Sequence, residues 1–180
     1  KVGGVVSDVS SSSGQAGTEV VISGTALRGF GDEVVEVLLH DRSATIISED
    51  DSSVSIVVTA GPDDEAEGDI TLISESGARV VAKGAWTYLT PGNIVVVDPA
   101  VGQKGTEVAI SGTNLCGGGA EVVTVTLDSM EADIDSQFNC GLINVVARDY
   151  GANDVGDVVL IADTGAKTTG EDLWRYVAAG

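Results

Sequence analysis

Two cysteines are the most reactive side chains of this chain of 180 residues, and they stand at Cys116 and Cys140. Zinc sites take three or four Cys or His ligands, and no other cysteine and only one histidine are present, so a zinc site is disfavoured. Two interpretations remain: the cysteines form a disulfide, or they are two free buried thiols. Their position in the fold has to decide between these.

Acidic side chains gather in three stretches: at 49–51, at 63–69 and at 149–157. Calcium binds several oxygens supplied by flexible loops, and the second and third stretches supply candidates for such a site. Its candidate ligands are Asp63, Asp64, Glu65, Glu67, Asp149 and Asp154. Their spacing fits no defined calcium loop, and solvated loop carboxylates are the alternative. We expect no other cofactor.

The charge balance limits the classes of partner. The chain carries 28 acidic and 9 basic residues, which gives a formal net charge of −19. Nucleic-acid binding depends on Lys and Arg that neutralise phosphates, so nucleic acid is excluded as a partner, and an anionic membrane surface is disfavoured. The acidity favours solubility, with adaptation to a salty medium as an alternative. No apolar stretch reaches the roughly 18 residues of a membrane span, and no signal peptide is visible.

One phrase occurs twice and organises the chain. Gly-Thr-Glu-Val-x-Ile-Ser-Gly-Thr-x-Leu stands at 17–27 and again at 105–115, so that Thr18 and Thr106 are 88 residues apart (106 − 18 = 88). The same offset, without a gap, aligns almost all of 4–92 with 92–180. A repeat of this length suits a small β domain, and we predict two domains, at 1–89 and 90–180.

Alternation of apolar and polar residues predicts strands in both copies. Val20 and Ile22 recur as Val108 and Ile110, and we expect the Thr and Glu of the phrase to face water. In the next strand Val35, Val37 and Leu39 form the expected inward face. A strand at 53–59 aligns with 141–147, but its register stays open because Ile56 aligns with Asn144. The last strand carries Trp-x-Tyr, at 86–88 and 174–176, which is expected to close the core.

His40 is the only histidine of the chain. The alternation places it on the outward face of its strand, and the second copy has Asp128 in its place. A Ser-His-Asp triad would depend on a residue that the repeat does not keep. We therefore expect no catalysis at His40 and no enzymatic activity in the chain.

Short strands with glycine-rich turns between them, and no helical period, predict antiparallel β-sandwiches. The order Val-x-Pro-x-x-Gly-x-x-Gly-Thr-x-Val-x-Ile-x-Gly-x-x-Leu, ending in Trp-x-Tyr, resembles the IPT/TIG domain, an immunoglobulin-like module. The second copy follows it from Val97 to Tyr176, whereas the first departs at Ser11 and Ala26. The resemblance implies an all-β chain of two tandem immunoglobulin-like antiparallel β-sandwiches of about seven strands each.

Such a path also bears on the cysteines. In an immunoglobulin-like sandwich the loop after the second strand and the loop before the fifth point to the same end. Cys116 and Cys140 fall in these loops, where the gapless alignment gives the first copy Arg28 and Ser52. We hypothesise a disulfide there, with two free buried thiols as the alternative.

The resemblance implies a role and little chemistry. IPT/TIG modules occur in plexin-like receptors, in surface proteins, in polysaccharide-acting enzymes and in Rel-type transcription factors, and the acidity argues against the last. We expect a fragment of a larger extracellular or cell-surface protein, a structural or adhesion repeat of a stalk, adhesin or filament. Its partners would be proteins or neighbouring repeats. The alternative is a carbohydrate- or ligand-binding accessory module of a secreted enzyme or receptor, with Phe30, Phe138 and Tyr150 as platforms for glycans.

Overall fold

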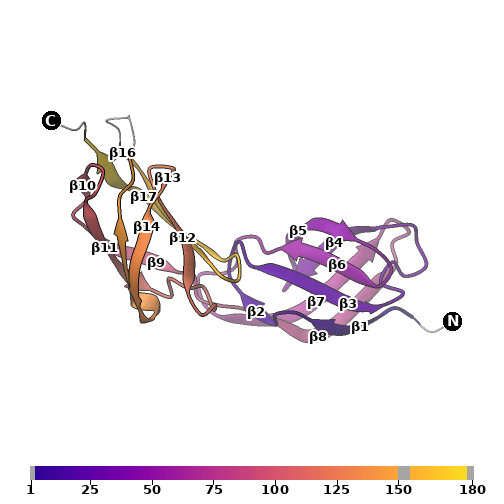
Figure 1. Ribbon diagram of the computed structural model, residues 1–180. Coiled ribbons are helices and arrows are strands. Elements are labelled where there is room, and N and C mark those ends of the chain that lie inside the picture. The colour runs from indigo at the N-terminus through magenta and orange to yellow at the C-terminus, as the bar shows by residue number, and fades with distance from the viewer. Residues whose placement is uncertain (1–2, 150–154, 178–180) are drawn as a thin grey trace. The chain divides into compact units, whose positions relative to one another are not determined.

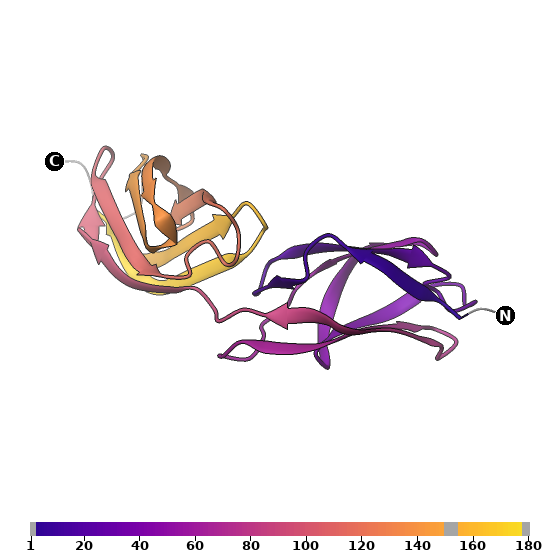
Figure 2. The same ribbon diagram turned by 90° about the horizontal axis from the view of Figure 1, so that it is seen from below.

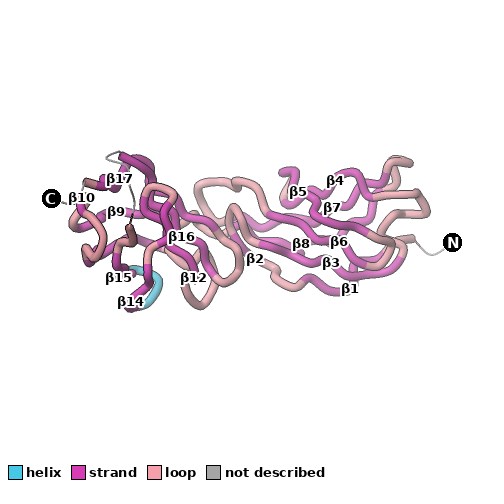
Figure 3. Tube along the Cα trace, turned by 45° about the horizontal axis from the view of Figure 1, so that its top comes forward, coloured by secondary structure: helices cyan, strands magenta, loops and turns pink. Residues whose placement is uncertain are grey.

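The structure is a computed structural model that describes residues 3–149 and 155–177. The chain divides into two compact units, Lys1–Thr90 and Pro91–Gly180. The division lies one residue from the boundary expected at 89/90. Strands make up nearly all the regular structure of both units, as Figure 3 shows.

The first unit is a β-sandwich in which one strand belongs to both layers. Its strands run in the order β1-β3-β6-β5-β4-β7-β8-β2, and β5 pairs with β6 in one layer and with β4 in the other (Figures 1 and 2). Apart from β2 and β8, which are parallel, neighbouring strands are antiparallel. The strands are β1 Val5–Val9, β2 Ser13–Gly14, β3 Glu19–Thr25, β4 Val34–Leu39, β5 Arg42–Glu49, β6 Ser53–Val57, β7 Ala66–Ser74 and β8 Arg79–Tyr88.

The second unit repeats this sandwich with β5 split in two. One layer has the order β14-β15-β11-β9 and the other β10-β17-β16-β12-β13, and a 3-10 helix, η1, follows β14 (Figure 1). The elements are β9 Asn93–Asp98, β10 Val101–Gly102, β11 Glu107–Thr113, β12 Val122–Leu127, β13 Met130–Glu131, β14 Asp133–Phe138, η1 Asn139–Gly141, β15 Leu142–Val146, β16 Val155–Ala162 and β17 Lys167–Tyr176. The all-β, immunoglobulin-like sandwich predicted from the sequence is confirmed.

Each unit has its own hydrophobic core. The Trp-x-Tyr pair is fully buried in both units, as predicted. The rings meet edge to face, with centroids 5.7 Å apart for Trp86 and Tyr88 and 5.4 Å apart for Trp174 and Tyr176. Such pairs add about 0.5–1.5 kcal/mol beyond the free energy of burial.

The repeated phrase contains the whole of the second long strand in each copy, β3 and β11, and the turn before it. Val20, Ile22 and their counterparts Val108 and Ile110 are buried, as predicted. The expectation that its threonines face water is wrong for Thr18, which is 1% exposed and whose hydroxyl accepts a hydrogen bond from the backbone N–H of Gln15. The hydroxyl closes the turn before the strand and therefore points inward.

The expected inward face of β4 is also partly wrong. A bulge between Val34 and Glu36 shifts the alternation, so that Val34, Val37 and Leu39 enter the core. Val35 is left half exposed at the bulge, as is Val123 in β12. A bulge adds one residue to a strand, which turns the side chains on either side of it to opposite faces.

The register left open for the fifth long strand is set by an offset of 89 residues. Val20 pairs with Ile56, and Val108 pairs with Val145 rather than with Asn144 (145 − 56 = 89). The second copy therefore contains one extra residue before β15, and the gapless alignment is wrong over this strand. By the same offset the structural counterpart of Cys140 is Asp51 and not Ser52.

Candidate binding site

The two cysteines lie together at one end of the second unit. Cys116, in the loop after β11, forms a disulfide with Cys140 in η1, and their Cα atoms are 5.2 Å apart. The backbone N–H of Leu115 also donates to the carbonyl of Cys140, at 3.0 Å. The disulfide hypothesis is confirmed, and the alternative of two free thiols is wrong.

An ion pair occupies this place in the first unit. Arg28, the counterpart of Cys116, donates from Nε and Nη2 to the carboxylate of Glu49, at 3.0 and 2.8 Å. Its backbone N–H donates to Oδ1 of Asp51, the structural counterpart of Cys140. The hydrogen bond from Arg28 lowers the pKa of Glu49 below its usual value, aided by the bond from the N–H of Val34. The same loop is thus held by charge in one unit and by a covalent bond in the other.

Gln137 takes the place of Glu49 in the second unit. Glu49 Oε2 accepts from the N–H of Val34 at 3.0 Å, and Gln137 Oε1 accepts from the N–H of Val122 at 2.9 Å. The Gln137 amide also donates to the carbonyl of Val122. With a cysteine in place of the arginine, a carboxylate here would have lost its counter-ion, whereas an amide needs none.

The candidate calcium ligands that the structure describes are not grouped as metal ligands. Asp63, Asp64 and Glu65 are exposed in the loop between β6 and β7, and Glu67 is exposed within β7. Asp149 is exposed and forms an ion pair with Lys104 at 3.7 Å. Asp154 and Tyr150 lie outside the described residues. Within residues 3–149 and 155–177 no three His, Cys, Asp or Glu side chains are grouped as metal ligands.

His40 is not on the face of a strand, contrary to the prediction. It follows the end of β4 in a turn in which His40 and Asp41 both have positive φ, 46° and 63°. The ring covers Gly68, where a Cβ atom would lie 2.2 Å from His40 Nδ1, and Asp128 covers Gly156 in the same way. Both glycines thus leave room for the side chain of the turn, which accounts for His40 as a structural residue.

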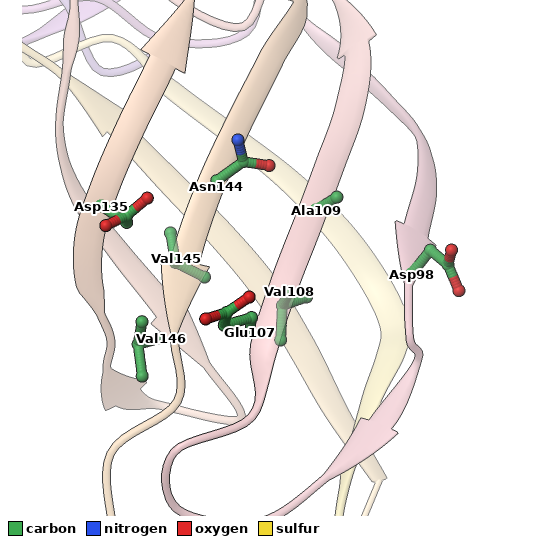
Figure 4. Close-up of a pocket in the computed structure, with 8 residues that line it drawn as sticks. All are labelled: Asp98, Glu107, Val108, Ala109, Asp135, Asn144, Val145 and Val146. Atoms are coloured by element: carbon green, nitrogen blue, oxygen red, sulfur yellow. The ribbon is translucent and has the colours of Figure 1, made fainter.

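A hollow that the sequence did not predict opens on the second unit, on the outer face of the β14-β15-β11-β9 sheet. Its volume is about 320 Å³, and the side chains of Ala109 and Asn144 form its floor (Figure 4). Glu107 and Asp135 lie beside it, and the carboxylate of Asp98 points away from it at the outer edge of β9 (Figure 4). Nothing among the described residues forms an ion pair with these three carboxylates.

The residues that form this hollow differ between the copies. The counterpart of Ala109 in the first unit is the larger Val21, and the counterpart of Asp135 is Ile47. Asn144 Nδ2 donates to Ser136 Oγ at 3.1 Å, so the amide is held down on the sheet. A sequence signal was present: positions where one copy has a large apolar residue and the other a small or acidic one.

No helix in the described part of the chain is both long enough and apolar enough to cross a membrane.

A family model for the IPT/TIG domain matches residues 5–88, which lie in the first unit. No curated protein matches the sequence.

Among solved structures, the chain is similar to the plexin A4 full extracellular region, with 18% identity and a TM-score of 0.56, over 98% of this chain and 16% of that one. A second plexin A4 structure gives 18% identity and a TM-score of 0.51, over 97% and 18% of the two chains. A surface glycan-binding protein, SGBP-B, from a xyloglucan utilization locus of Bacteroides uniformis gives 15% identity and a TM-score of 0.36, over 95% and 49%. The chain spans less than a fifth of the plexin chains, and its likeness to them is one of fold.

Proposed function

We propose that the chain is a pair of IPT/TIG-type modules, the second as well as the first, from a larger extracellular or cell-surface protein, and that it works without catalysis through contacts with other proteins. Membership of the second unit is supported by the shared phrase, the shared strand order and the equivalent Trp-Tyr pairs. The 88-residue offset that relates these features supports the descent of both units from one module.

The disulfide supports the location. Disulfides form and persist in oxidising compartments and are rare in the reducing cytosol. The Cys116–Cys140 disulfide holds a loop of the second unit, whereas an ion pair holds the equivalent loop of the first unit. The fold can therefore hold this loop without a disulfide. The covalent solution is stable only where thiols are oxidised, as they are outside the cell.

The observation that carries the proposed role is an open edge strand at the equivalent place in each unit, β1 and β9. In the described part of the chain, β1 pairs with β3 and with no strand on its other side, and β9 pairs with β11 alone. Open edges present backbone donors and acceptors that another chain can pair with.

Exposed aromatic rings support a second candidate, recognition of glycans. The side chains of Phe30 and Phe138 are each 58% exposed, one in each unit. Both tryptophans are buried, so neither can stack on a sugar ring. Binding on a glycan array that is lost in both Phe30→Ala and Phe138→Ala would favour this second candidate.

The main proposal is tested in cells that express the parent protein with an epitope tag between Asp63 and Glu65. An antibody applied to intact cells is expected to label the tag, and a membrane-impermeant cross-linker to join this segment to other proteins. Labelling that requires permeabilised cells would refute the location. Labelled cells that yield no protein cross-links from either unit would refute the role.

A further inference from the structure

The equivalent edge strands β1 and β9 differ in how they are protected. Both edge strands contain a bulge, with Ser7 as the extra residue in β1 and Val95 in β9. The next residue is Asp8 in β1 and Val96 in β9. Charged residues and bulges on an edge strand discourage pairing with other chains. β1 carries such a charge at its centre, with Val5 exposed at its start, whereas β9 has valines at both central positions.

The two valines of β9 lie open to solvent. Val95 is 62% exposed and Val96 is 49% exposed. Val96 stands opposite Ser111 on the outer face of the sheet, next in line to Asp98, which stands opposite Ala109. An added strand would cover the apolar side chains and satisfy the backbone groups along the free side of β9.

The hollow lies on the same face, one strand further in. Ala109 and Asn144 form its floor, and Glu107 and Asp135 lie beside it. Neighbouring strands are about 4.8 Å apart, so a side chain on an added strand would meet Asp98 first. A long basic side chain that passes Asp98 would then come under the attraction of Glu107 and Asp135, above Ala109, where the first unit has the larger Val21.

We propose that the free edge of β9, with the acidic hollow beside it, binds an extended basic segment of a partner protein, which adds a strand next to β9 and directs Lys or Arg side chains toward Asp98 and the hollow. This inference rests on the proposed function and names the chemistry of the partner. A second copy of this chain does not fit the site, because its net charge of −19 and the Asp98 of its own β9 would repel these carboxylates.

The probe is a short capped peptide of alternating lysine and valine, with a control peptide in which glutamate replaces lysine. Both are titrated at low salt into the disulfide-intact chain, with the backbone amide resonances recorded by NMR. The lysine peptide is expected to shift resonances along β9 and β11, and the glutamate peptide to shift none. Absence of binding by the lysine peptide, or shifts confined to other strands, would overturn the proposal.

Variants at the edge and in the hollow provide the controls. The double variant V95S/V96S removes the exposed apolar side chains of β9 without adding a charge that would attract lysine, and it is expected to weaken the affinity by about tenfold. A109V, which copies the Val21 of the first unit, narrows the hollow and is expected to weaken binding as well. All three positions are at the surface, so unchanged amide spectra elsewhere will show that the variants fold.

A charge-matched pair separates a specific site from general attraction to an acidic chain. Asp98→Ser is expected to weaken binding by about threefold, within the range of one cross-strand charge pair, and Asp63→Ser to have no effect. Equal losses in the two variants would refute the site. Self-association of the chain through β9 without peptide, seen by light scattering, would refute the assigned partner. Either failure leaves the test in intact cells, and with it the proposed function, unaffected.

Discussion

In the first unit the loop after β3 is held by the Arg28–Glu49 ion pair, whereas in the second unit the loop after β11 is held by the Cys116–Cys140 disulfide. The side chains of Arg28 and Glu49 are 31% and 17% exposed, so water still screens the pair in part. A disulfide is insensitive to pH and salt but depends on the redox state of its surroundings. The loop of the first unit is therefore held by an interaction that depends on pH and salt, and the loop of the second unit by a bond that depends on the redox state.

The difference extends to the residue that the arginine contacts. Replacing arginine by cysteine alone would leave Glu49 beside the backbone of Val34 with an unbalanced charge. The second unit has Gln137 there, which keeps the hydrogen bond to the N–H of the strand and adds one to its carbonyl. Three positions therefore change as a set between the copies.

The largest loss of stability is expected when a large core side chain is removed from either unit. Trp86→Ala and Trp174→Ala are each expected to destabilise their own unit by about 3–5 kcal/mol, because both rings are fully buried. Urea denaturation of each variant, followed by amide signals assigned to each unit, measures the effect. A variant that lowers the stability of both units equally would show that the units do not unfold independently.

Loss of the disulfide should have the next largest effect, and in the second unit alone. The double variant C116S/C140S is expected to lose about 3 kcal/mol, because the bond closes a loop whose ends are separated by 24 residues. Denaturation with and without reductant gives the same comparison in the wild type. Stability of the second unit that does not change on reduction would contradict the expectation, and the first unit serves as the internal control.

A smaller loss of stability is expected when the carboxylate of the Arg28–Glu49 ion pair is replaced by a neutral amide. Glu49→Gln leaves Arg28 without its carboxylate and is expected to lower the melting temperature of the first unit only. The matched change in the second unit, Gln137→Glu, is also expected to destabilise, because its carboxylate would face the Val122 carbonyl with no arginine beside it. Equal stability of Glu49→Gln and wild type would show that the ion pair contributes nothing measurable.

The pH dependence gives the smallest expected difference. The pKa of Glu49 is lowered in the folded state, so its stabilising effect is present above the unfolded pKa of about 4.3 and is lost as the pH falls through the folded value. Between pH 7 and about pH 3 the first unit should therefore lose more stability in the wild type than in Glu49→Gln. Melting curves across this range test the point, and parallel losses in the two proteins would contradict it.

The sequence predicted the features that both copies keep. Val20, Ile22 and the Trp-x-Tyr pair are core residues because their spacing recurs unchanged, and the cysteines were placed correctly because the order of strands fixes which loops share an end. The register of β15 could not be predicted in this way. Val145 and Val146 are both apolar, so a shift of one residue leaves the pattern plausible, and only backbone pairing shows that Val145 faces inward.

The candidate site was missed for a related reason. Ala109 and Asp135 are unremarkable residues alone, and the hollow exists only because four strands bring them together on one face. The acidic residues that the sequence singled out for calcium are not grouped as metal ligands within the described residues. Local spacing shows which side chains share a strand, whereas the surface they form depends on strand pairing across the sheet.

The disulfide also has a mechanical consequence. If the chain is pulled from its two ends and a unit unfolds, the residues between Cys116 and Cys140 stay behind the covalent link and cannot extend. An extended chain spans at most about 3.5 Å per residue, so the separation of 24 residues withholds about 80 Å of length. Under load the first unit would extend to the full length of its unfolded chain. The second unit would extend by a shorter length until a reductant breaks the disulfide.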